Sequence, residues 1–324
     1  MSTFTSKLGP QLIAFIDHKQ RLGHRYVSSA EVLRSFDRFV ADLPLNDAAL
    51  TEGVVRAYVA ARPIASRSNT LSVLRQFGRF LAADDPSVFV APPRFLSVRH
   101  RSAPARVLTV AEVRLFLDST ELLQSVDCSP LRDISHAMAL RTLLMTGLRL
   151  EELRTLRDAD VDLDANVIVV RSGKLGKPRH VPLSSEFAKR LRAYRSALHE
   201  RVEHRLVSDA FFPGPDGHKT ISAPSLYATF RKTIEMAGIK HGGRGAGPRL
   251  HDLRHTFAVL RLLSWYRQGQ DLYAKLPLLA TYMGHVGIGS TQLYLHMTQD
   301  LVGEVTRRKA QHFGDVIQAP GGVQ

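Results

Sequence analysis

Apolar residues in the first quarter of the chain recur every three or four positions, which is the spacing of one face of an α-helix. Leu12, Phe15 and Ile16 share such a face in the first segment. Serines precede the apolar face of the second segment, and Thr51 precedes the third, so both could provide N-caps. The pattern predicts a small bundle of four amphipathic helices with short connections. The expected helices are 8–23, 28–43, 51–62 and 66–85, and the outward face of the last carries Arg67, Arg75 and Arg79.

The helical period stops after this bundle, in a stretch rich in proline and arginine. Proline cannot continue a helix, so a stretch of this composition without a period indicates an extended connection. We therefore predict a linker at 91–106 between an N-terminal helical DNA-binding domain at 1–90 and a second domain at 107–324. The charge of the linker fits a solvated spacer and also fits a segment that wraps a duplex.

The second domain returns to helical spacing and contains the strongest strand signal of the chain. Residues 166–174 and 177–184 are β-strand-like and flank a turn with glycine and lysine, which predicts a β-hairpin. Thr109 is placed to cap the first helix, and Gly147 divides a long apolar segment into two. The expected fold class is mainly α with a small β-sheet (α+β). The expected helices are 108–120, two within 132–156, 184–202, 222–239 and 250–269.

The composition indicates a folded, strongly basic protein. The chain has 324 residues, 44% of them hydrophobic, and a formal net charge of +14. Positive charge spread along a folded chain favours a polyanionic partner, above all nucleic acid. The chain has one cysteine, Cys128, in a turn-like segment. A single cysteine excludes an internal disulfide and cysteine-rich zinc sites. Because no signal-peptide pattern or membrane-length apolar run is seen, we expect a cytoplasmic, bacterial protein without a membrane partner.

Breaking a phosphodiester without a metal ion requires three kinds of group. A nucleophile attacks phosphorus, fixed donors stabilise the charge on the nonbridging oxygens, and an acid protonates the leaving oxygen. Arginine suits the oxygens because its planar guanidinium is permanently charged and can bind two of them. Tyrosine can be the nucleophile, but its free pKa of about 10 requires activating surroundings.

The second domain carries these groups in order. A lone arginine or histidine among them would more often be structural, so the ordered set is what favours chemistry. His251 and Arg254 are three residues apart and share one helix face. The candidates are Arg149 in "TGLR", Lys174 in the hairpin turn "GKLGK", His251 and Arg254 in "HDLRH", His285 in "MGH", and Tyr294 nine residues later.

This ordered set resembles the tyrosine recombinases, the phage integrase family. The resemblance covers about 107–305, and the N-terminal helices resemble, more weakly, the core-binding domain of that family. By position, the resemblance assigns a role to each candidate. Arg149 and Arg254 would bind the scissile phosphate, and His285 would hydrogen-bond a nonbridging oxygen. Tyr294 would be the nucleophile, and His251 would activate or orient it. Lys174 would protonate the departing 5′-oxygen, and Glu152 would support the site beside Arg149.

Some of these assignments have alternatives within the sequence. Lys177 lies in the same hairpin turn as Lys174 and could be the general acid instead. Glu152 could simply pair with a neighbouring arginine. His255 follows Arg254 directly and could be structural or lie near the phosphate.

The resemblance implies a conservative reaction that needs neither a cofactor nor a metal ion. The nucleophile forms a 3′-phosphotyrosine, and a 5′-hydroxyl of a partner duplex rejoins the strand through a Holliday junction. The partners would be double-stranded DNA with specific recombination sites, and further protomers in a homo-tetramer or an assembly with sister recombinases. The chain contains no "GxxxxGK[ST]" nucleotide-binding motif. The segment 301–318 could form a helix that docks on a neighbouring protomer or on its own domain.

Other functions remain as alternatives. The segment between Arg254 and His285 is several residues longer than in the Xer pattern, with extra helix or loop expected around 264–275. This favours a recombinase of a mobile element, acting in integration or transposition, over a Xer-like resolvase of chromosome or plasmid dimers. A type IB topoisomerase shares the catalytic set, and a catalytically silent DNA-binding protein would need a broken one. A metal nuclease would need a cluster of carboxylates and histidines, which the sequence does not suggest.

Overall fold

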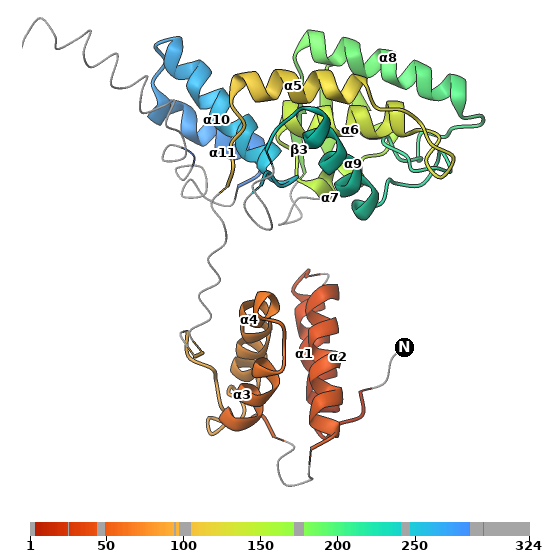
Figure 1. The fold of residues 1–324 in the computed structure, drawn as a ribbon. Coiled ribbons are helices and arrows are strands. Elements are labelled where there is room, and N and C mark those ends of the chain that lie inside the picture. The colour runs from red at the N-terminus through yellow and green to blue at the C-terminus, as the bar shows by residue number, and fades with distance from the viewer. Residues whose placement is uncertain are drawn as a thin grey trace, which may run out of the picture. The chain divides into compact units, whose positions relative to one another are not determined.

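The computed structural model describes residues 4–24, 26–43, 49–93, 95–96, 105–171, 178–240 and 247–285, together with Tyr294. The chain divides into two compact units, residues 1–102 and 103–324, which we call the first and the second unit. Figure 1 shows their elements. The predicted fold class is confirmed, because the described elements are helices and one small antiparallel sheet.

The first unit consists of helices that enclose a core rich in phenylalanine. Phe15, Phe36 and Phe77 are fully buried in it, and the rings of Phe15 on the first helix and Phe77 on the last lie 5.5 Å apart. The predicted cap at Thr51 is confirmed, since its side chain accepts a hydrogen bond from the N–H of Val54. The helices are α1 (Gly9–Arg21), α2 (Val27–Ala41), α3 (Glu52–Ala60) and α4 (Ile64–Leu81).

The predicted serine cap of the second helix is wrong. Helix α2 begins at Val27, so Ser28 and Ser29 lie inside its first turn, and no side chain caps it. The residue before it, Tyr26, has a φ of 51° and so adopts the left-handed conformation. The chain therefore enters this helix through a sharp backbone turn, which the hydrophobic period does not reveal.

The chain continues to pack on the first unit after α4. Ala91 and Phe95 are buried in its core. Arg75 donates hydrogen bonds of 2.7 and 2.8 Å to the carbonyls of Ala91 and Pro92. Two apolar residues within a proline-rich stretch have no period, so the sequence pattern gave no sign of this packing. Residues 97–104 of the expected linker lie outside the described residues.

The second unit places helices around a three-stranded antiparallel sheet in the order β1-β2-β3. The predicted hairpin is confirmed: β2 pairs with β3, Val170 opposite Arg179. The predicted cap at Thr109 is also confirmed, as part of a capping box with Glu112. The elements are α5 (Val110–Glu121), the π-helix η1 (Arg132–His136), α6 (Ala137–Thr146), α7 (Leu150–Arg154), the 3₁₀-helix η2 (Asp158–Asp160), β1 (Val161–Asp162), β2 (Val167–Val170), β3 (Arg179–Pro182), α8 (Ser185–Arg201), α9 (Ala223–Met236), α10 (Asp252–Arg267) and α11 (Leu272–Met283).

Helices α10 and α11 form one end of the second unit (Figure 1). The candidates His251 and Arg254 lie at the start of α10, and His285 follows the end of α11. Helix α10 packs against α6, and α11 packs against both α10 and β3. The segment 264–275, where extra helix or loop was expected, contains the end of α10, a turn, and the start of α11. Asp271 caps α11 by accepting a hydrogen bond from the N–H of Tyr273.

Gly147 ends α6 and turns the chain toward α7. Its φ of 63° lies in the left-handed region, where a residue with a Cβ is strained. A Cβ at this position would also lie only 2.5 Å from Cδ1 of Phe257, a residue of α10. Gly147 therefore permits both the sharp turn before Arg149 and the close approach of α10.

We expect Gly147→Ala to destabilise the second unit by about 2–4 kcal/mol, the sum of a left-handed backbone and an overpacked contact. Gly238→Ala is the matched control, because Gly238 also has a φ of 65° after a helix but has open space around its Cβ position. It should lose only about 1–2 kcal/mol. Urea unfolding followed by the fluorescence of Trp265, the one tryptophan of the chain and a residue of α10, measures both. Equal losses would contradict the packing argument.

Candidate active site

The structure brings five of the six candidate catalytic residues together in the second unit. Arg149 is the N-cap residue of α7, and His251 is the N-cap residue of α10. Arg254 lies one turn into α10, and His285 directly follows the left-handed Gly284 that ends α11. Tyr294 lies beside His285, with ring centroids 5.9 Å apart. The sixth candidate, Lys174, and its alternative Lys177 lie outside the described residues.

Glu152 holds Arg149 in place through a capping box. Its carboxylate accepts hydrogen bonds from the backbone N–H of Arg149 at 2.9 Å and from its Nη1 at 2.7 Å. Glu152 is only 4% exposed. Burial alone would raise the pKa of Glu152, but hydrogen bonds from Arg179 and Arg149 outweigh it and lower the pKa to about 2. The carboxylate is therefore ionised at neutral pH. It both pairs with the charge of Arg149 and fixes the position of that residue through the backbone and side-chain hydrogen bonds.

Arg179 is a member of this site that the sequence analysis missed. From the start of β3 it donates to both oxygens of Glu152, at 2.9 and 2.7 Å, and through Nε to the carbonyl of Tyr282 at 2.9 Å. Its side chain is 11% exposed. The available signal was an arginine at the first position of the strand that follows the predicted hairpin turn, but strand alternation does not distinguish this residue from a solvent-facing one.

Arg254 is the most deeply buried charge of the site, at 3% exposure. Its Nη1 and Nη2 donate to the carbonyls of Gly147 and Met283, at 2.5 and 2.6 Å. Burial, and then the positive charge of Arg149, lower the pKa of Arg254 to about 10, so it stays protonated at neutral pH. These bonds use two of the five N–H donors of a guanidinium.

The cluster carries more positive than negative charge. Arg149 and Arg179 share the carboxylate of Glu152, while Arg254 donates to neutral carbonyls. Within these described contacts, three guanidinium groups therefore face one carboxylate. Buried charge of one sign is unfavourable unless it meets its opposite, so the cluster is suited to bind an anion with several oxygens, such as a phosphate group.

Tyr294 is buried beside this positive cluster. It is 3% exposed and packs in a small core with residues of α10 and α11, among them Phe257 and Met283. Burial raises the pKa of Tyr294, and the charge and a hydrogen bond of Arg254, together with the charge of Arg149, partly offset this. The phenol is therefore protonated at neutral pH, and the positive charge of the two arginines favours its phenolate form.

Three histidines line the site. The rings of His251 and His255 lie 4.8 Å apart, and that of His255 lies 5.4 Å from the ring of Tyr294. From the sequence, His255 could be structural or lie near the phosphate. Its spacing of four residues from His251 indicated that both lie on one face of the helix. The buried Nδ1 of His255 has no hydrogen-bond partner among the described residues. The ring of His255 thus lies next to the ring of Tyr294, within the candidate site.

All three histidines are neutral at pH 7. Burial, followed by the charge of Arg254, lowers the pKa of His285 to about 4. Burial and then His251 lower the pKa of His255 to about 4. The pKa of His251 is lowered by burial and by Arg254. A neutral imidazole can accept a proton, whereas a bound phosphate anion would raise these pKa values and favour hydrogen-bond donation.

We expect the second unit to lose stability as the pH falls from about 6.5, the pKa of free histidine, toward about 4. In this pH range the histidines are protonated in the unfolded chain but stay neutral in the folded chain, so protonation favours unfolding. Urea midpoints at pH 7 and pH 5, measured by Trp265 fluorescence, test this above the range in which Glu152 titrates. Replacing His255 and His285 together by glutamine should flatten the dependence, leaving the parts due to His251 and to His136, whose pKa burial also lowers to about 4. An unchanged pH dependence in the double variant would contradict the assignment.

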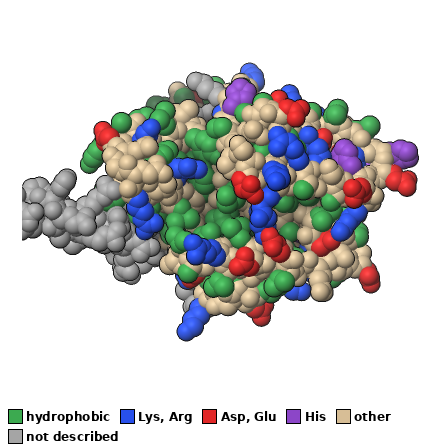
Figure 2. All heavy atoms as spheres, turned by 90° about the horizontal axis from the view of Figure 1, so that it is seen from above, with side chains coloured by type: hydrophobic (Ala, Val, Ile, Leu, Met, Phe, Trp, Pro, Cys, Tyr) green, Lys and Arg blue, Asp and Glu red, His purple; other side chains and the backbone are tan. Residues whose placement is uncertain are grey.

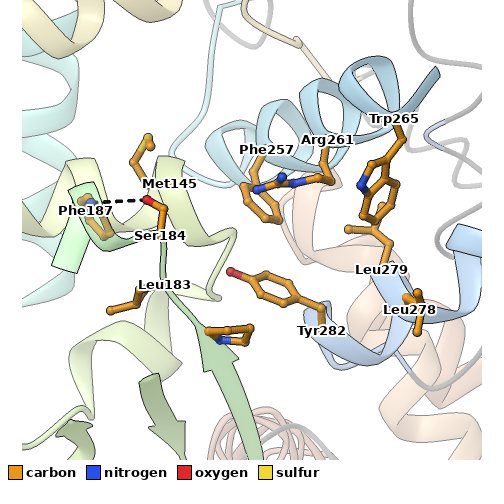
Figure 3. A pocket seen from close by; sticks show the side chains of 11 residues that line it. Met145, Leu183, Ser184, Phe187, Phe257, Arg261, Trp265, Leu278, Leu279 and Tyr282 are labelled. Atoms are coloured by element: carbon orange, nitrogen blue, oxygen red, sulfur yellow. Dashed lines mark hydrogen bonds between the residues drawn. The ribbon is translucent and has the colours of Figure 1, made fainter. Parts of the chain in front are cut away.

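An apolar groove adjoins the site. Its volume is about 430 Å³, and Figure 3 shows side chains from α8, α10 and α11 around it. Phe257 and Tyr282, which both line the groove, stack with ring centroids 5.4 Å apart. Tyr282 thus faces the groove with its ring while its carbonyl accepts from Arg179. On the face seen in Figure 2, hydrophobic side chains line a hollow bordered by lysine and arginine.

Other sequence candidates lie apart from this chemistry. Cys128 is exposed in a turn closed by the bridge between Val126 and Ser129. Across the described ranges, no group of three or more histidine, cysteine, aspartate or glutamate residues is placed to bind a metal ion. No helix in the described part of the chain is long and apolar enough to cross a membrane.

Known proteins match the chain over most of its length. The model of the phage integrase family matches residues 106–300. The putative integrase/recombinase y4rB of Sinorhizobium fredii is 31% identical over 321 residues, 97% of this chain and 99% of the relative. The tyrosine recombinase XerD of Bradyrhizobium diazoefficiens is 30% identical over 312 residues, 91% of this chain and 86% of the relative.

Two solved structures share the fold at lower identity. The Tn1549 transposon integrase in complex with transposon right-end DNA has a TM-score of 0.64 at 17% identity, covering 93% of this chain and 99% of that one. The XerH site-specific recombinase bound to its difH substrate has a TM-score of 0.61 at 18% identity, covering 86% of this chain and 78% of that one. Together with the family match over well more than half of the chain, these findings show that the protein belongs to the phage integrase family and is a tyrosine recombinase, an enzyme of site-specific recombination.

Proposed function

We propose that the chain cuts and rejoins double-stranded DNA at specific sites, with Tyr294 as the nucleophile. The observation that carries this proposal is the position of a buried tyrosine beside guanidinium groups that outnumber their carboxylate partner. Such a cluster is arranged to hold a phosphodiester next to a hydroxyl. The family to which the chain belongs supports the same reaction.

In this proposal, the Tyr294 oxygen attacks the phosphorus while the bond from phosphorus to the 5′-oxygen breaks. Arg149, Arg254 and His285 bind the nonbridging oxygens, where charge builds up in the transition state. His251 activates or orients the phenol, whose proton it can accept because its imidazole is neutral. Lys174 gives a proton to the departing 5′-oxygen. The product is a 3′-phosphotyrosine and a free 5′-hydroxyl, and the reverse attack by another 5′-hydroxyl rejoins the strand.

The partner of this site is the DNA backbone. The net charge of +14 supports strong phosphate binding, which should weaken steeply as salt rises because bound counterions are released. The first unit, residues 1–102, is proposed to bind the duplex together with the second unit. Exchange between two duplexes, each cut on both strands, needs four active sites, so we propose a tetramer of this chain or an assembly with sister recombinases.

We further propose that the recombinase serves a mobile element, in integration or transposition, within the bacterial cytoplasm where the DNA lies. The extended region of α10 and α11 and the names of the relatives support this role. A Xer-like resolvase of DNA dimers is the second candidate, supported by the XerD relative. An inactive DNA-binding protein is less well supported, because every candidate residue within the described part of the chain lies in one cluster. A type IB topoisomerase shares the catalytic set, and it is less well supported because the relatives are named as recombinases and integrases.

Covalent capture tests the proposed function. Cells that express the protein are lysed in denaturant, the protein is purified, and the attached DNA is sequenced. We expect attached DNA that shares one junction sequence; junctions at the ends of a mobile element would support integration or transposition, and one chromosomal locus would support a resolvase. Cleavage of that sequence in vitro should persist in EDTA. Absence of attached DNA, or cleavage that EDTA stops, would contradict the proposal.

A further inference from the structure

The end of helix α11 is held by three arginine side chains. Arg179 donates to the carbonyl of Tyr282 at 2.9 Å, Arg254 to that of Met283 at 2.6 Å, and Arg149 to that of Gly284 at 2.7 Å. The last carbonyls of a helix have no partner within it and carry the negative end of the helix dipole. Three guanidinium groups from β3, α10 and the N-terminus of α7 therefore converge on three consecutive carbonyls.

This junction determines where the catalytic side chains lie. His285 is the next residue after Gly284, and its position depends on how α11 ends. Arg149 and Arg254 have roles on the phosphate in the proposed function. Arg179 differs from the other two because its described side-chain hydrogen bonds use Nε, Nη1 and Nη2, whereas those of Arg149 and Arg254 use only Nη1 and Nη2.

Arg179 also determines how Glu152 acts on Arg149. Each carboxylate oxygen of Glu152 accepts one hydrogen bond from Arg149 and one from Arg179. Without Arg179, the buried carboxylate would lose half of these bonds and could rotate, and its charge would fall on Arg149 alone. Arg149 would then bind Glu152 more strongly and a phosphate less strongly.

We propose that Arg179 is a positioning residue of this site, which shares the charge of Glu152 so that Arg149 stays available for the phosphate and which fixes the end of α11 before His285. This inference rests on the proposed function. It gives the start of β3 a defined part in catalysis, although Arg179 itself does not touch the reacting atoms.

Gly284 gives independent support for a required contact. Its φ is 65°, and a Cβ there would lie 3.0 Å from Nη1, 3.1 Å from Cζ and 3.2 Å from Nε of Arg179. The guanidinium of Arg179 thus lies flat against a position without a side chain. We expect Gly284→Ala to displace Arg179 and to reproduce the defect of an Arg179 variant.

The first test is the single-turnover cleavage rate of Arg179→Met and Arg179→Lys. Methionine keeps much of the volume and removes every donor, whereas lysine keeps the charge but cannot bind both oxygens of Glu152 and the Tyr282 carbonyl together. We expect both to lose about 10–100-fold in rate, the usual effect of removing a residue that orients a catalytic one. The substrate is a synthetic duplex with the junction sequence recovered by capture. A rate within threefold of wild type in both variants would overturn the proposal.

The second test separates positioning from loss of structure. In a methylphosphonate duplex, a methyl group replaces one nonbridging oxygen at the cleaved position and removes its negative charge, so the arginines matter less. If Arg179 acts through Arg149, Arg179→Met should lose less rate on the methylphosphonate than on the phosphate, as Arg149→Ala should. An equal fold-loss on both substrates, or a Trp265 unfolding midpoint that falls enough to leave the protein unfolded at the assay temperature, would assign Arg179 a structural role only.

The two proposals fail in different ways. If wild type gives no covalent DNA complex, the proposed function is wrong and Arg179 has no reaction to assist. If wild type forms the complex and the Arg179 variants form it equally fast, only the role of Arg179 is wrong.

Discussion

Tyr294→Phe should abolish DNA strand cleavage and covalent attachment while leaving DNA binding and folding intact. The phenyl ring keeps the packing of the buried Tyr294 against α10 and α11, and only the attacking oxygen is lost. Without a nucleophile no phosphotyrosine can form, so the rate should fall below detection. Cleavage is measured on an end-labelled duplex with the captured junction sequence, and binding is measured by titration of the same duplex.

Tyr282→Phe is the matched control. Tyr282 is a partly buried tyrosine that packs against the same small core, and this burial raises its pKa to about 12. Its ring stacks on Phe257 and faces the groove, and the variant keeps the backbone carbonyl that Arg179 binds. We expect near wild-type cleavage from this variant. Retained cleavage in Tyr294→Phe, or its loss in Tyr282→Phe instead, would show that the nucleophile is wrongly assigned.

Arg149→Ala should lower the cleavage rate by about 10²–10³-fold, the effect of removing one fixed donor to a developing negative charge. The loss should appear in the single-turnover rate more than in the affinity for DNA, because the contact strengthens as charge builds up on the nonbridging oxygens. The fold should tolerate the change, since Arg149 is 24% exposed and Glu152 keeps its two hydrogen bonds from Arg179.

Arg154→Ala provides the control for this variant. Arg154 lies on the same helix α7, is 20% exposed, and pairs with Glu151 three residues before it, as Arg149 pairs with Glu152 three residues after it. Arg154→Ala removes one positive charge from the same helix as Arg149→Ala does, but at a position outside the site. We expect its rate to stay within a fewfold of wild type. Similar losses from both variants would mean that net charge, and not a specific phosphate contact, explains the effect.

Local sequence patterns predicted the elements that local interactions determine. Threonines before amphipathic segments became the caps of α3 and α5, and the glycine in "TGLR" became the left-handed end of α6. The β-branched residues around 166–170 formed the expected hairpin strand. The short strand β1, Val161–Asp162, was not predicted, because two residues are too few to show a period. The domain boundaries and the roles of the site residues stay predictions.

The sequence could not show how distant elements meet. Arg179 reaches Glu152 across 27 positions and Tyr282 across 103, and the bond from Arg149 to Gly284 spans 135. No local spacing encodes such contacts, so the junction at the end of α11 emerged only from the fold. The structure shows why Glu152 has a second donor, since a single partner would leave its buried carboxylate incompletely bonded.

Mass spectrometry of the covalent complex tests the central claim most directly. The wild-type protein is trapped on its DNA under denaturing conditions, digested with nuclease and protease, and the peptide that carries residual nucleotide is sequenced. We predict a nucleotide linked through phosphate to the side chain of Tyr294. A nucleotide on another residue, or a complex without any phosphotyrosine, would contradict it.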